Sequence, residues 1–433
     1  MDKSLRKSDY LSVLISLTPV LFISLGIIFW KGISEVDFGD GQDYLKSAKS
    51  ILDNSGYLRE GLTWPFFRPP GYPFFIATVW KVSGTESILL LKLFNVAFHL
   101  ISTYLVFRIV TRNHRRNTGI IGALLFGLNP FVLIPLTEIQ TEPLTLLLFL
   151  LFSYLISGKY NKFSVILIPF ASIFIVAVRP EYLIIILSIC LVMLFKSHRN
   201  SKVITQVSVI VLILVTSISW WGNQNRQASG SFIPLTNATS YLLWNGSTEY
   251  IYRNYEISLQ YDPKFDSTQY IGIQNEIKSK IDIWGSQYSQ GGLGGQSNLW
   301  MSAYFANIQE DPSKYVIKTF EKAAIFWRPF LNPRSHGFTT SLLSLVILLP
   351  LSFGAGVILV KNRRQLKKEL FVKAYLAGFV GLTIVHAFQM PDQRYKFPLL
   401  IPFASILLAP TLSGWIFHVL KKLTPSLLHR RFE

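Results

Sequence analysis

The sequence predicts an all-α polytopic membrane protein with about ten transmembrane helices. Half of its 433 residues are hydrophobic and only 15% are charged, whereas soluble domains carry about 25% charged residues. Several stretches run for about 20 residues with almost no charge, which is the length that a helix needs to cross a hydrocarbon core of roughly 30 Å. The single cysteine, Cys190, excludes a disulfide or a cysteine-based metal site within one chain.

Ten apolar segments are expected to form the spans. The first follows three basic residues and lacks a small-residue cleavage site, so we expect a retained helix rather than a cleaved signal peptide. The predicted spans are Tyr10–Trp30, Ser87–Phe107, Gly119–Leu136, Glu142–Ile156, Phe163–Val178, Tyr182–Phe195, Val203–Trp221, Thr340–Val360, Ala374–Met390 and Phe397–Val419.

The basic residues indicate which side of the membrane each loop faces. With the N-terminus inside, the inner segments account for the whole net charge of +18, and the outer segments have no net charge. This distribution satisfies the positive-inside rule, so the charge orients the protein and does not indicate a nucleic-acid partner. We expect a multi-pass protein of the cell (inner) membrane with both termini cytoplasmic, membrane lipids as neighbours, and any chemistry on the outer side.

Three regions follow from this order of spans. Residues 1–221 form a transmembrane catalytic module of seven spans, with the first outer loop at residues 31–86. Residues 222–338 form an extracytoplasmic, mostly helical loop or cap, in which residues 312–328 are expected to be an interfacial amphipathic helix. Residues 339–433 contain the last three spans and a cytoplasmic tail.

The amphipathic helix of the cap has its charges on one side. Asp311 and Pro312 start it, with proline at the tolerated first position. Its apolar stripe lies apart from a set of lysines: the stripe is Val316, Phe320, Ala323, Ala324 and Trp327, and the lysines are Lys314, Lys318 and Lys322.

The first outer loop is too polar to lie in lipid and begins with three carboxylates, Asp37, Asp40 and Asp43. From Asp40 onward, apolar residues recur at the spacing of one helical face, which predicts a helix at the membrane interface. Residues Pro69 and Pro70 then favour an extended turn. A second short helix is predicted over residues 72–82.

These loop residues are suited to chemistry at a membrane surface. An aspartate near lipid can take a proton from a substrate hydroxyl, and Asp40 and Asp43 are the candidates. Taken alone, each is better explained as a solvated helix cap, and the case for chemistry rests on the cluster together with its partners. Arg68, held beside two prolines, can present a fixed fork of donors to a phosphate.

Further polar residues lie at the outer ends of later spans. Glu138 and Glu142 stand one helical turn apart at the mouth of the fourth span, where an acidic residue is costly unless it faces a polar cavity. Arginines that return to the outer surface run against the positive-inside trend. They occur beside further polar groups, in Arg179-Pro180-Glu181 and in Arg394-Tyr395.

These motifs together resemble the GT-C superfamily of membrane glycosyltransferases. They are Asp40-Gly41-Gln42-Asp43-Tyr44 after a first span and Phe67-Arg68-Pro69-Pro70-Gly71-Tyr72-Pro73, followed by the later glutamate and the two arginine motifs. The chain is most similar to the bacterial branch related to dolichyl-phosphate-mannose protein mannosyltransferases and to the aminoarabinose transferases of lipid A. The resemblance runs from about residue 10 to residue 420 and is strongest before residue 182.

The resemblance implies transfer of a sugar from a polyprenyl-phosphate donor to an extracytoplasmic acceptor hydroxyl, with inversion. It places the catalytic aspartate at Asp40 and phosphate ligands at Arg68 and Arg394. Glu142 matches the acidic residue near the acceptor. Gly41 stands where the family often has glutamate, and the sequence indicates no metal or other cofactor.

Two other functions remain open, and so does the acceptor. A transporter or flippase of lipid-linked saccharides would have inverted repeats and charged, broken spans at the bilayer midplane, and no such repeat is evident. A polymerase or ligase of lipid-linked saccharides would occupy the same location. The acceptor could be a lipid, a protein or a polysaccharide.

Overall fold

The computed structural model describes residues 7–36, 40–53, 68–158, 162–197, 200–247, 298, 300–366 and 369–423. Within these ranges every regular element is a helix, which confirms the all-α fold class. Asp37 and Phe67, from the two motifs of the first outer loop, lie outside the described residues.

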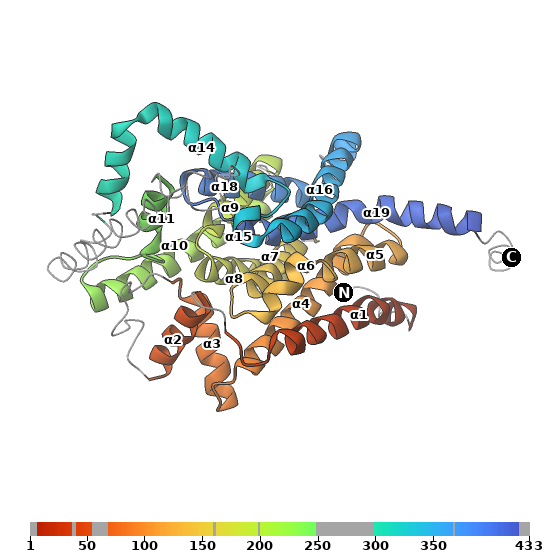
Figure 1. Cartoon of the computed structure of the whole chain (residues 1–433), viewed down its shortest axis with the longest axis horizontal. Coiled ribbons are helices and arrows are strands. Elements are labelled where there is room, and N and C mark those ends of the chain that lie inside the picture. Colours follow the sequence, from red (N-terminus) through yellow and green to blue (C-terminus); the bar gives the residue numbers. More distant parts are fainter. Residues whose placement is uncertain are drawn as a thin grey trace.

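The helices in chain order, with the two 3-10 helices labelled η, are α1 (Lys7–Lys31), α2 (Asp40–Leu52), α3 (Gly71–Ser83), α4 (Ile88–Thr111), α5 (Arg116–Gly127), α6 (Pro130–Leu133), η1 (Ile134–Thr137), α7 (Glu142–Ile156), α8 (Lys162–Val178), α9 (Tyr182–Ser197), α10 (Ser201–Ser229), α11 (Ala238–Ser247), α14 (Pro312–Trp327), α15 (Pro333–His336), α16 (Phe338–Lys361), α17 (Arg363–Leu366), α18 (Leu370–Phe388), η2 (Gln393–Lys396) and α19 (Phe397–Leu423). Figure 1 shows α2, α3, α11 and α14 toward one end of the molecule, and the C-terminal part of α19 at the other.

Within the described ranges, six helices are long and apolar enough to cross a membrane. They belong to α1, α4, α10, α16, α18 and α19. The pair formed by α5 and the α6–η1 segment is bent by 62° at a short break and would make a seventh span. The apolar helices α7, α8 and α9 are shorter, and a 15-residue helix such as α7 is only about 22 Å long. The predicted segments are therefore helical, but ten crossings are not confirmed.

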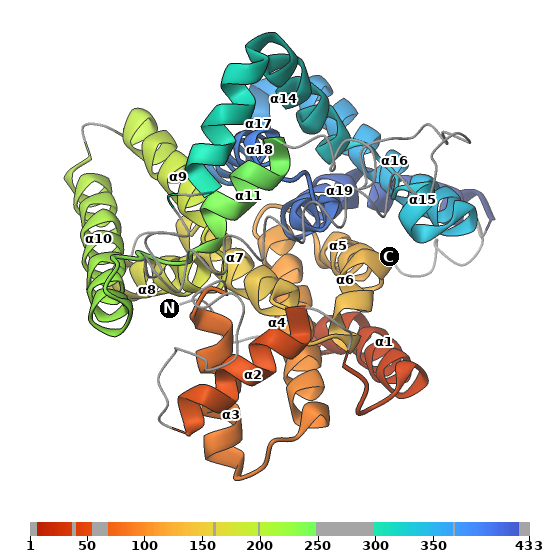
Figure 2. The ribbon, with the colours of Figure 1, turned by 60° about the vertical axis from the view of Figure 1, so that its left-hand side comes forward.

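The short helices α7 and α9 both pack against α18. The ring of Phe149 on α7 lies 5.6 Å from that of Tyr182 on α9 and 5.2 Å from that of Tyr375 on α18. The long helices at the periphery are different, because α1, α10 and α16 bury only 28%, 22% and 22% of their apolar stretches. Figure 2 shows α10 on one flank of the molecule, and α1 and α16 on the opposite flank.

Both helices predicted in the first outer loop are present as α2 and α3. Tyr44 of α2 packs edge-to-face on Tyr72 of α3, with ring centroids 5.1 Å apart. The backbone of Gly71, at the start of α3, lies so close to α8 that an added Cβ would come within 2.7 Å of the backbone of Ala177 and Val178. The Pro-Pro-Gly turn therefore seats α3 directly against the outer end of α8.

The cap differs from the sequence prediction in two ways. Helix α10 does not end near Trp221 but continues to Ser229, because the polar residues after Trp221 are helix-compatible up to Gly230, which adopts a left-handed conformation as the C-cap. The second difference concerns α14, which was expected to be an interfacial amphipathic helix: two of its lysines, Lys318 and Lys322, are buried.

Lys322, the more deeply buried of the two lysines, is held inside by hydrogen bonds to backbone carbonyls. Lys322 Nζ donates hydrogen bonds to the carbonyl oxygens of Gly246, at 2.9 Å, and Phe388, at 3.2 Å. These carbonyls lie in the last turns of α11 and α18, where a helix lacks donors of its own. The exposed face of α14 instead carries Val316 and Phe320, with 54% and 74% of their surface exposed.

Candidate active site

A pocket of about 330 Å³ brings together all the predicted site residues except Asp43 and Glu138. Its walls come from the start of α2, the turn before α3, the start of α7, the α8–α9 connection, the residues before α11, and the α18–α19 connection. The predicted residues that line it are Asp40, Arg68, Glu142, Arg179, Glu181, Arg394 and Tyr395.

Arg68 ties together the two aspartates of α2. Its Nη2 lies 2.6 Å from Oδ1 of Asp40 and 3.0 Å from Oδ2 of Asp43, and its Nε lies 3.2 Å from the same oxygen of Asp43. Asp40 and Asp43 meet one guanidinium because residues three apart share a helix face. Burial alone would lower the pKa of Arg68, but the nearby aspartates outweigh that effect and raise it.

The ring of Tyr44 packs against the guanidinium of Arg68 in this ion cluster. The guanidinium carbon of Arg68 lies 5.6 Å from the centre of the Tyr44 ring, within cation–π range. Burial raises the pKa of Tyr44 to about 12, so the phenol is neutral. Tyr44 also lines the pocket, although it was not among the predicted site residues. Its position four residues after Asp40, on the same helix face, is the sequence signal that could have revealed this.

Arg179, which is itself buried, is the centre of a second cluster. It lies 2.6 Å from Glu142 and 3.4 Å from Glu181, and its Nε donates to Thr141 Oγ1 at 2.8 Å. Its guanidinium also stacks on the ring of Tyr395, with 4.3 Å between the guanidinium carbon and the ring centre. Sequence reasoning missed Thr141, which carries no charge to distinguish it.

Electrostatics maintain the charge on this second arginine. Burial would lower the pKa of Arg179, but Glu142 and Glu181 outweigh it, so the pKa rises well above its ordinary value. Burial also raises the pKa of Glu181, and Arg179 offsets only part of that rise. The cluster joins the starts of α7 and α9 to η2, and therefore fixes one wall of the pocket.

Arg394 is the more accessible arginine, with 46% of its side chain exposed. It makes a two-point contact with Oδ2 of Asp392, through Nε at 3.0 Å and Nη2 at 2.8 Å. Burial would raise the pKa of Asp392, but Arg394 outweighs it and holds the pKa below its usual value. Asp392 also caps η2 through the backbone N–H of Arg394, so this carboxylate fixes where the guanidinium lies.

Glu138 does not join the pocket. It pairs with Lys31 at 3.3 Å and lines a second cavity together with Glu142 and Arg394. The two glutamates that were expected one helical turn apart are in fact separated by a bend, since Glu138 follows η1 and Glu142 begins α7. Glu142 therefore lines both cavities, whereas Glu138 lines only the second one.

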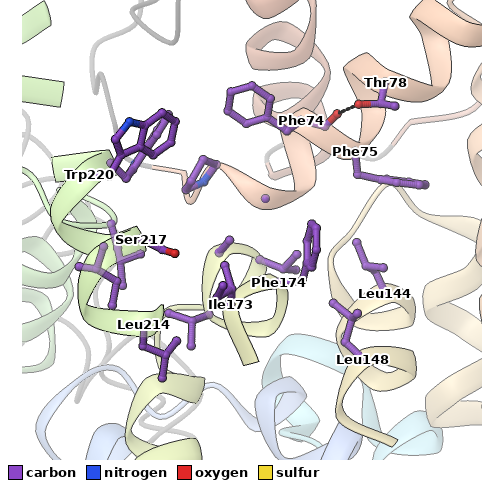
Figure 3. Close-up of a pocket in the computed structure, with 18 of the residues that line it drawn as sticks. Phe74, Phe75, Thr78, Leu144, Leu148, Ile173, Phe174, Leu214, Ser217 and Trp220 are labelled. Carbon is purple, nitrogen blue, oxygen red and sulfur yellow. Dashed lines mark hydrogen bonds between the residues drawn. The ribbon is translucent and has the colours of Figure 1, made fainter. Parts of the chain in front are cut away.

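A large apolar groove opens beside the pocket and was not evident from the sequence. Its volume is about 830 Å³, and it shares Val178 and Leu235 with the pocket. Figure 3 shows side chains from α3, α7, α8 and α10 converging on it. The residues labelled there are Phe74, Phe75, Thr78, Leu144, Leu148, Ile173, Phe174, Leu214, Ser217 and Trp220.

The groove and the pocket meet at the Pro-Pro turn. Pro69 lines the pocket and Pro70, the next residue, lines the groove. Arg68 therefore lies where a charged space ends and an apolar one begins. In the described part of the chain, no three His, Cys, Asp or Glu side chains are grouped so that they could hold a metal ion.

The architecture is that of an α-helical membrane protein with a charged pocket at the ends of its apolar helices. No protein-family model matches the sequence, and no curated protein matches it. The fold is similar to a solved structure of the archaeal oligosaccharyltransferase AglB from Archaeoglobus fulgidus in complex with an inhibitory peptide and a dolichol-phosphate. The TM-score is 0.52 and the sequence identity is 12%.

This likeness covers 95% of the present chain and 52% of the archaeal one, so the chain spans about half the length of the protein that it matches. At this identity the likeness shows a shared fold and no more. Membership of the GT-C superfamily, and of its bacterial branch, stays a prediction.

Proposed function

We propose that this protein is a membrane glycosyltransferase that moves a sugar from a polyprenyl-phosphate donor to the hydroxyl of an acceptor on the outer side of the membrane. The observation that carries the proposal is the joining of a charged pocket to an apolar groove at the Arg68-Pro69-Pro70 turn. A polyprenyl-phosphate sugar has the same two parts, an anionic head and a long apolar tail.

The groove suits the tail of the donor. It is lined almost wholly by apolar side chains, and α10, which forms one side of it, buries only 22% of its apolar stretch. A chain of isoprene units would enter it from the bilayer without leaving an apolar environment. With the tail there, the phosphate reaches the pocket near Arg68.

The pocket supplies what the transfer needs. The acceptor oxygen attacks the anomeric carbon, its proton passes to the Asp40 carboxylate, and the bond from that carbon to the phosphate oxygen breaks. The electron pair leaves with the polyprenyl phosphate, which is already an anion and needs cations rather than a proton donor. Arg68 and Arg394 are the proposed cations, with Tyr395 beside them, and a single displacement inverts the anomeric centre.

The remaining residues are proposed to face the acceptor. Glu142, Arg179 and Glu181 form the buried wall of the pocket, and Glu138 lies in the adjoining cavity. Because Arg179 is engaged by both glutamates, we assign it to holding this wall in place. We further propose that the N- and C-termini are cytoplasmic and that residues 1–221 carry most of the catalytic module, completed by Arg394 and Tyr395 from the last region.

A transporter or flippase is the main competing function. Such a protein needs polar groups along a path through the bilayer, whereas the charged clusters described here lie at helix ends and in connections between helices. Turnover of donor separates the two functions, because a flippase leaves the sugar–phosphate bond intact.

The experiment that tests the proposal measures sugar release and transfer by the purified protein in lipid nanodiscs, with a panel of radiolabelled undecaprenyl-phosphate sugars. Removing a general base costs about 10²–10⁴ in rate. We therefore expect Asp40→Asn to lose at least about a hundredfold. Asp43→Asn should lose less, because Asp43 does not line the pocket, and Asp311→Asn, at the start of α14, serves as a control carboxylate.

The outcomes separate the assignments. If Asp43→Asn abolishes transfer and Asp40→Asn does not, the base is Asp43. If both variants turn over like the unmodified protein, Asp40 is not a base and the enzymatic proposal loses its central residue. If the unmodified protein moves intact donor across a bilayer without breaking it, the protein is a flippase.

A further inference from the structure

A second cavity adjoins the charged pocket on the side away from the apolar groove. It has a volume of about 390 Å³ and shares Gln140, Glu142 and Arg394 with the pocket. Its other walls come from α4, α6, η1, α15, α16 and the start of α19. Figure 2 shows α6, α15 and α16 on the flank opposite α8 and α10, which border the groove. The shared wall therefore lies between two spaces that approach it from opposite flanks.

This cavity is polar at one end and apolar over most of its length. Glu138, Glu142 and Arg394 stand at the polar end. The remaining lining is mainly apolar, from Phe131, Val132, Ile134, Pro135, Leu136 and Leu146 together with Leu331 and Phe397. A ligand that fits this distribution has a polar head beside the charged pocket and an apolar body.

The cavity also reaches deep into the protein. His99 of α4 lines it, and His99 lies seven residues after Lys92 and nine residues before Arg108. At 1.5 Å per residue these separations are about 10 Å and 14 Å along the helix. The uncharged part of α4 between the two basic residues matches most of a hydrocarbon core of roughly 30 Å, so His99 lies near its middle.

Part of the cavity wall lies at the surface of the protein, beside helices with exposed apolar faces. Ile134, which lines it, has 50% of its surface exposed. Two helices with largely unburied apolar faces stand nearby, since η1 contacts α1, and Thr340 of α16 lines the cavity. An entrance at Ile134 would therefore admit a ligand that is already dissolved in the membrane.

We infer that the acceptor is a membrane lipid that carries a saccharide, and that its apolar tail occupies this second cavity. The inference rests on the proposed glycosyl transfer. A soluble peptide or polysaccharide would have to place polar backbone or hydroxyl groups in an apolar space near the middle of the membrane, which is costly without partners. A lipid-linked saccharide places only its tail there and presents its hydroxyl groups at Glu142, in the pocket that Asp40 also lines.

The arrangement gives donor and acceptor separate entrances. The donor tail lies between α3, α8 and α10, and the acceptor tail lies between η1, α16 and α19. The two heads meet at the wall that the cavities share. Neither lipid has to leave before the other enters, so both can be bound when the acceptor hydroxyl attacks.

A spin-label measurement tests the cavity without requiring turnover. A nitroxide is attached to Ile134→Cys in the full protein in nanodiscs, where the native Cys190 is buried and does not compete for the label. A lipid-filled entrance should give high collision rates with oxygen, which dissolves in lipid, and low rates with a water-soluble nickel chelate. A water-filled entrance would show the reverse and would overturn the inference.

A second measurement tests the acceptor. The assay uses radiolabelled undecaprenyl-phosphate sugar as donor and a bacterial glycolipid extract as acceptor, and it measures the ratio of sugar transfer to donor hydrolysis. Ile134→Trp should narrow the entrance for the acceptor and lower this ratio at least tenfold. Val346→Trp is the matched control, because Val346 is an exposed apolar residue of α16 that does not line the cavity, and its ratio should not change.

The possible failures are distinguishable. Donor hydrolysis by the unmodified protein, with transfer to a soluble peptide or polysaccharide and none to lipid, overturns this inference and leaves the proposed function standing. An unchanged ratio in Ile134→Trp likewise overturns it. If the unmodified protein neither hydrolyses nor transfers any sugar of the panel, the proposed function fails, and this inference fails with it.

Discussion

Replacing Gly71 by alanine tests whether the position of α3 sets the geometry of the site. A Cβ at Gly71 would lie 2.7 Å from both the carbonyl carbon of Ala177 and the nitrogen of Val178, whereas ordinary contacts begin at 3.4 Å. Both atoms belong to the backbone of α8 and cannot rotate away. The helices α3 and α8 must therefore separate by about 0.7 Å, the difference between these two distances.

The expected loss follows from this shift. Overpacking of a tight contact costs about 1–3 kcal/mol of stability, and a misplacement of about 1 Å can cost about a hundredfold in rate. Arg68 stands three residues before Gly71, and Arg179 directly follows α8, so the separation pulls the two arginine clusters apart. We expect Gly71→Ala to lower the transfer rate by roughly ten- to a hundredfold, with a modest fall in melting temperature.

The assay combines thermal unfolding in detergent with sugar transfer in nanodiscs. Gly356→Ala is the matched control, because an added Cβ on this glycine of α16 meets nothing within 4 Å. Alanine should there be neutral or stabilising by up to about 1 kcal/mol. If Gly71→Ala has the melting temperature and the transfer rate of the unmodified protein, the close contact of α3 with α8 does not position the site. The reasoning from packing to catalysis is then wrong.

Three further predictions concern charge. Arg179→Met should destabilise the protein by about 3–5 kcal/mol, measured by chemical unfolding, because it leaves the buried Glu142 and the partly buried Glu181 without their cation; an unchanged stability would mean that water reaches the cluster. Burial and the neighbouring lysine lower the pKa of Lys322 from 10.5 to about 7, so between these values the unfolded chain binds more protons and the free energy of unfolding should rise with pH. Lys322→Met should remove this rise, whereas Lys314→Met, at an exposed position, should keep it. Topology reporters fused after Gly230 and after Lys361 should read outside and inside respectively, and the opposite result would place the site in the cytoplasm.

The sequence by itself determined the all-helical class and, in the first outer loop, where the two helices begin. The first outer loop shows this clearly, since Asp40 opens α2 and Gly71 opens α3, as capping, proline and periodicity indicated. It also indicated most of the pocket, because charged residues at the outer ends of apolar segments need a polar environment wherever they fold.

The tertiary structure decided which of these residues meet. Arg68 contacts Asp40 and Asp43 across about 25 residues of chain, whereas Arg179 contacts Glu142 from α7 as well as the nearby Glu181. Only the folded chain shows that Glu138 faces a different cavity from the pocket. Local rules fix the face of a helix on which a side chain lies, but not the partner that covers that face.

The apolar groove and the second cavity are the parts that no sequence pattern revealed. In a soluble protein the apolar face of a helix points to the core, so periodicity locates the interior. In a membrane, lipid is as apolar as the core, and residues that face either one look alike in the sequence. Whether Phe74 or Ile134 contacts protein, lipid or a cavity is therefore decided only when the helices pack together.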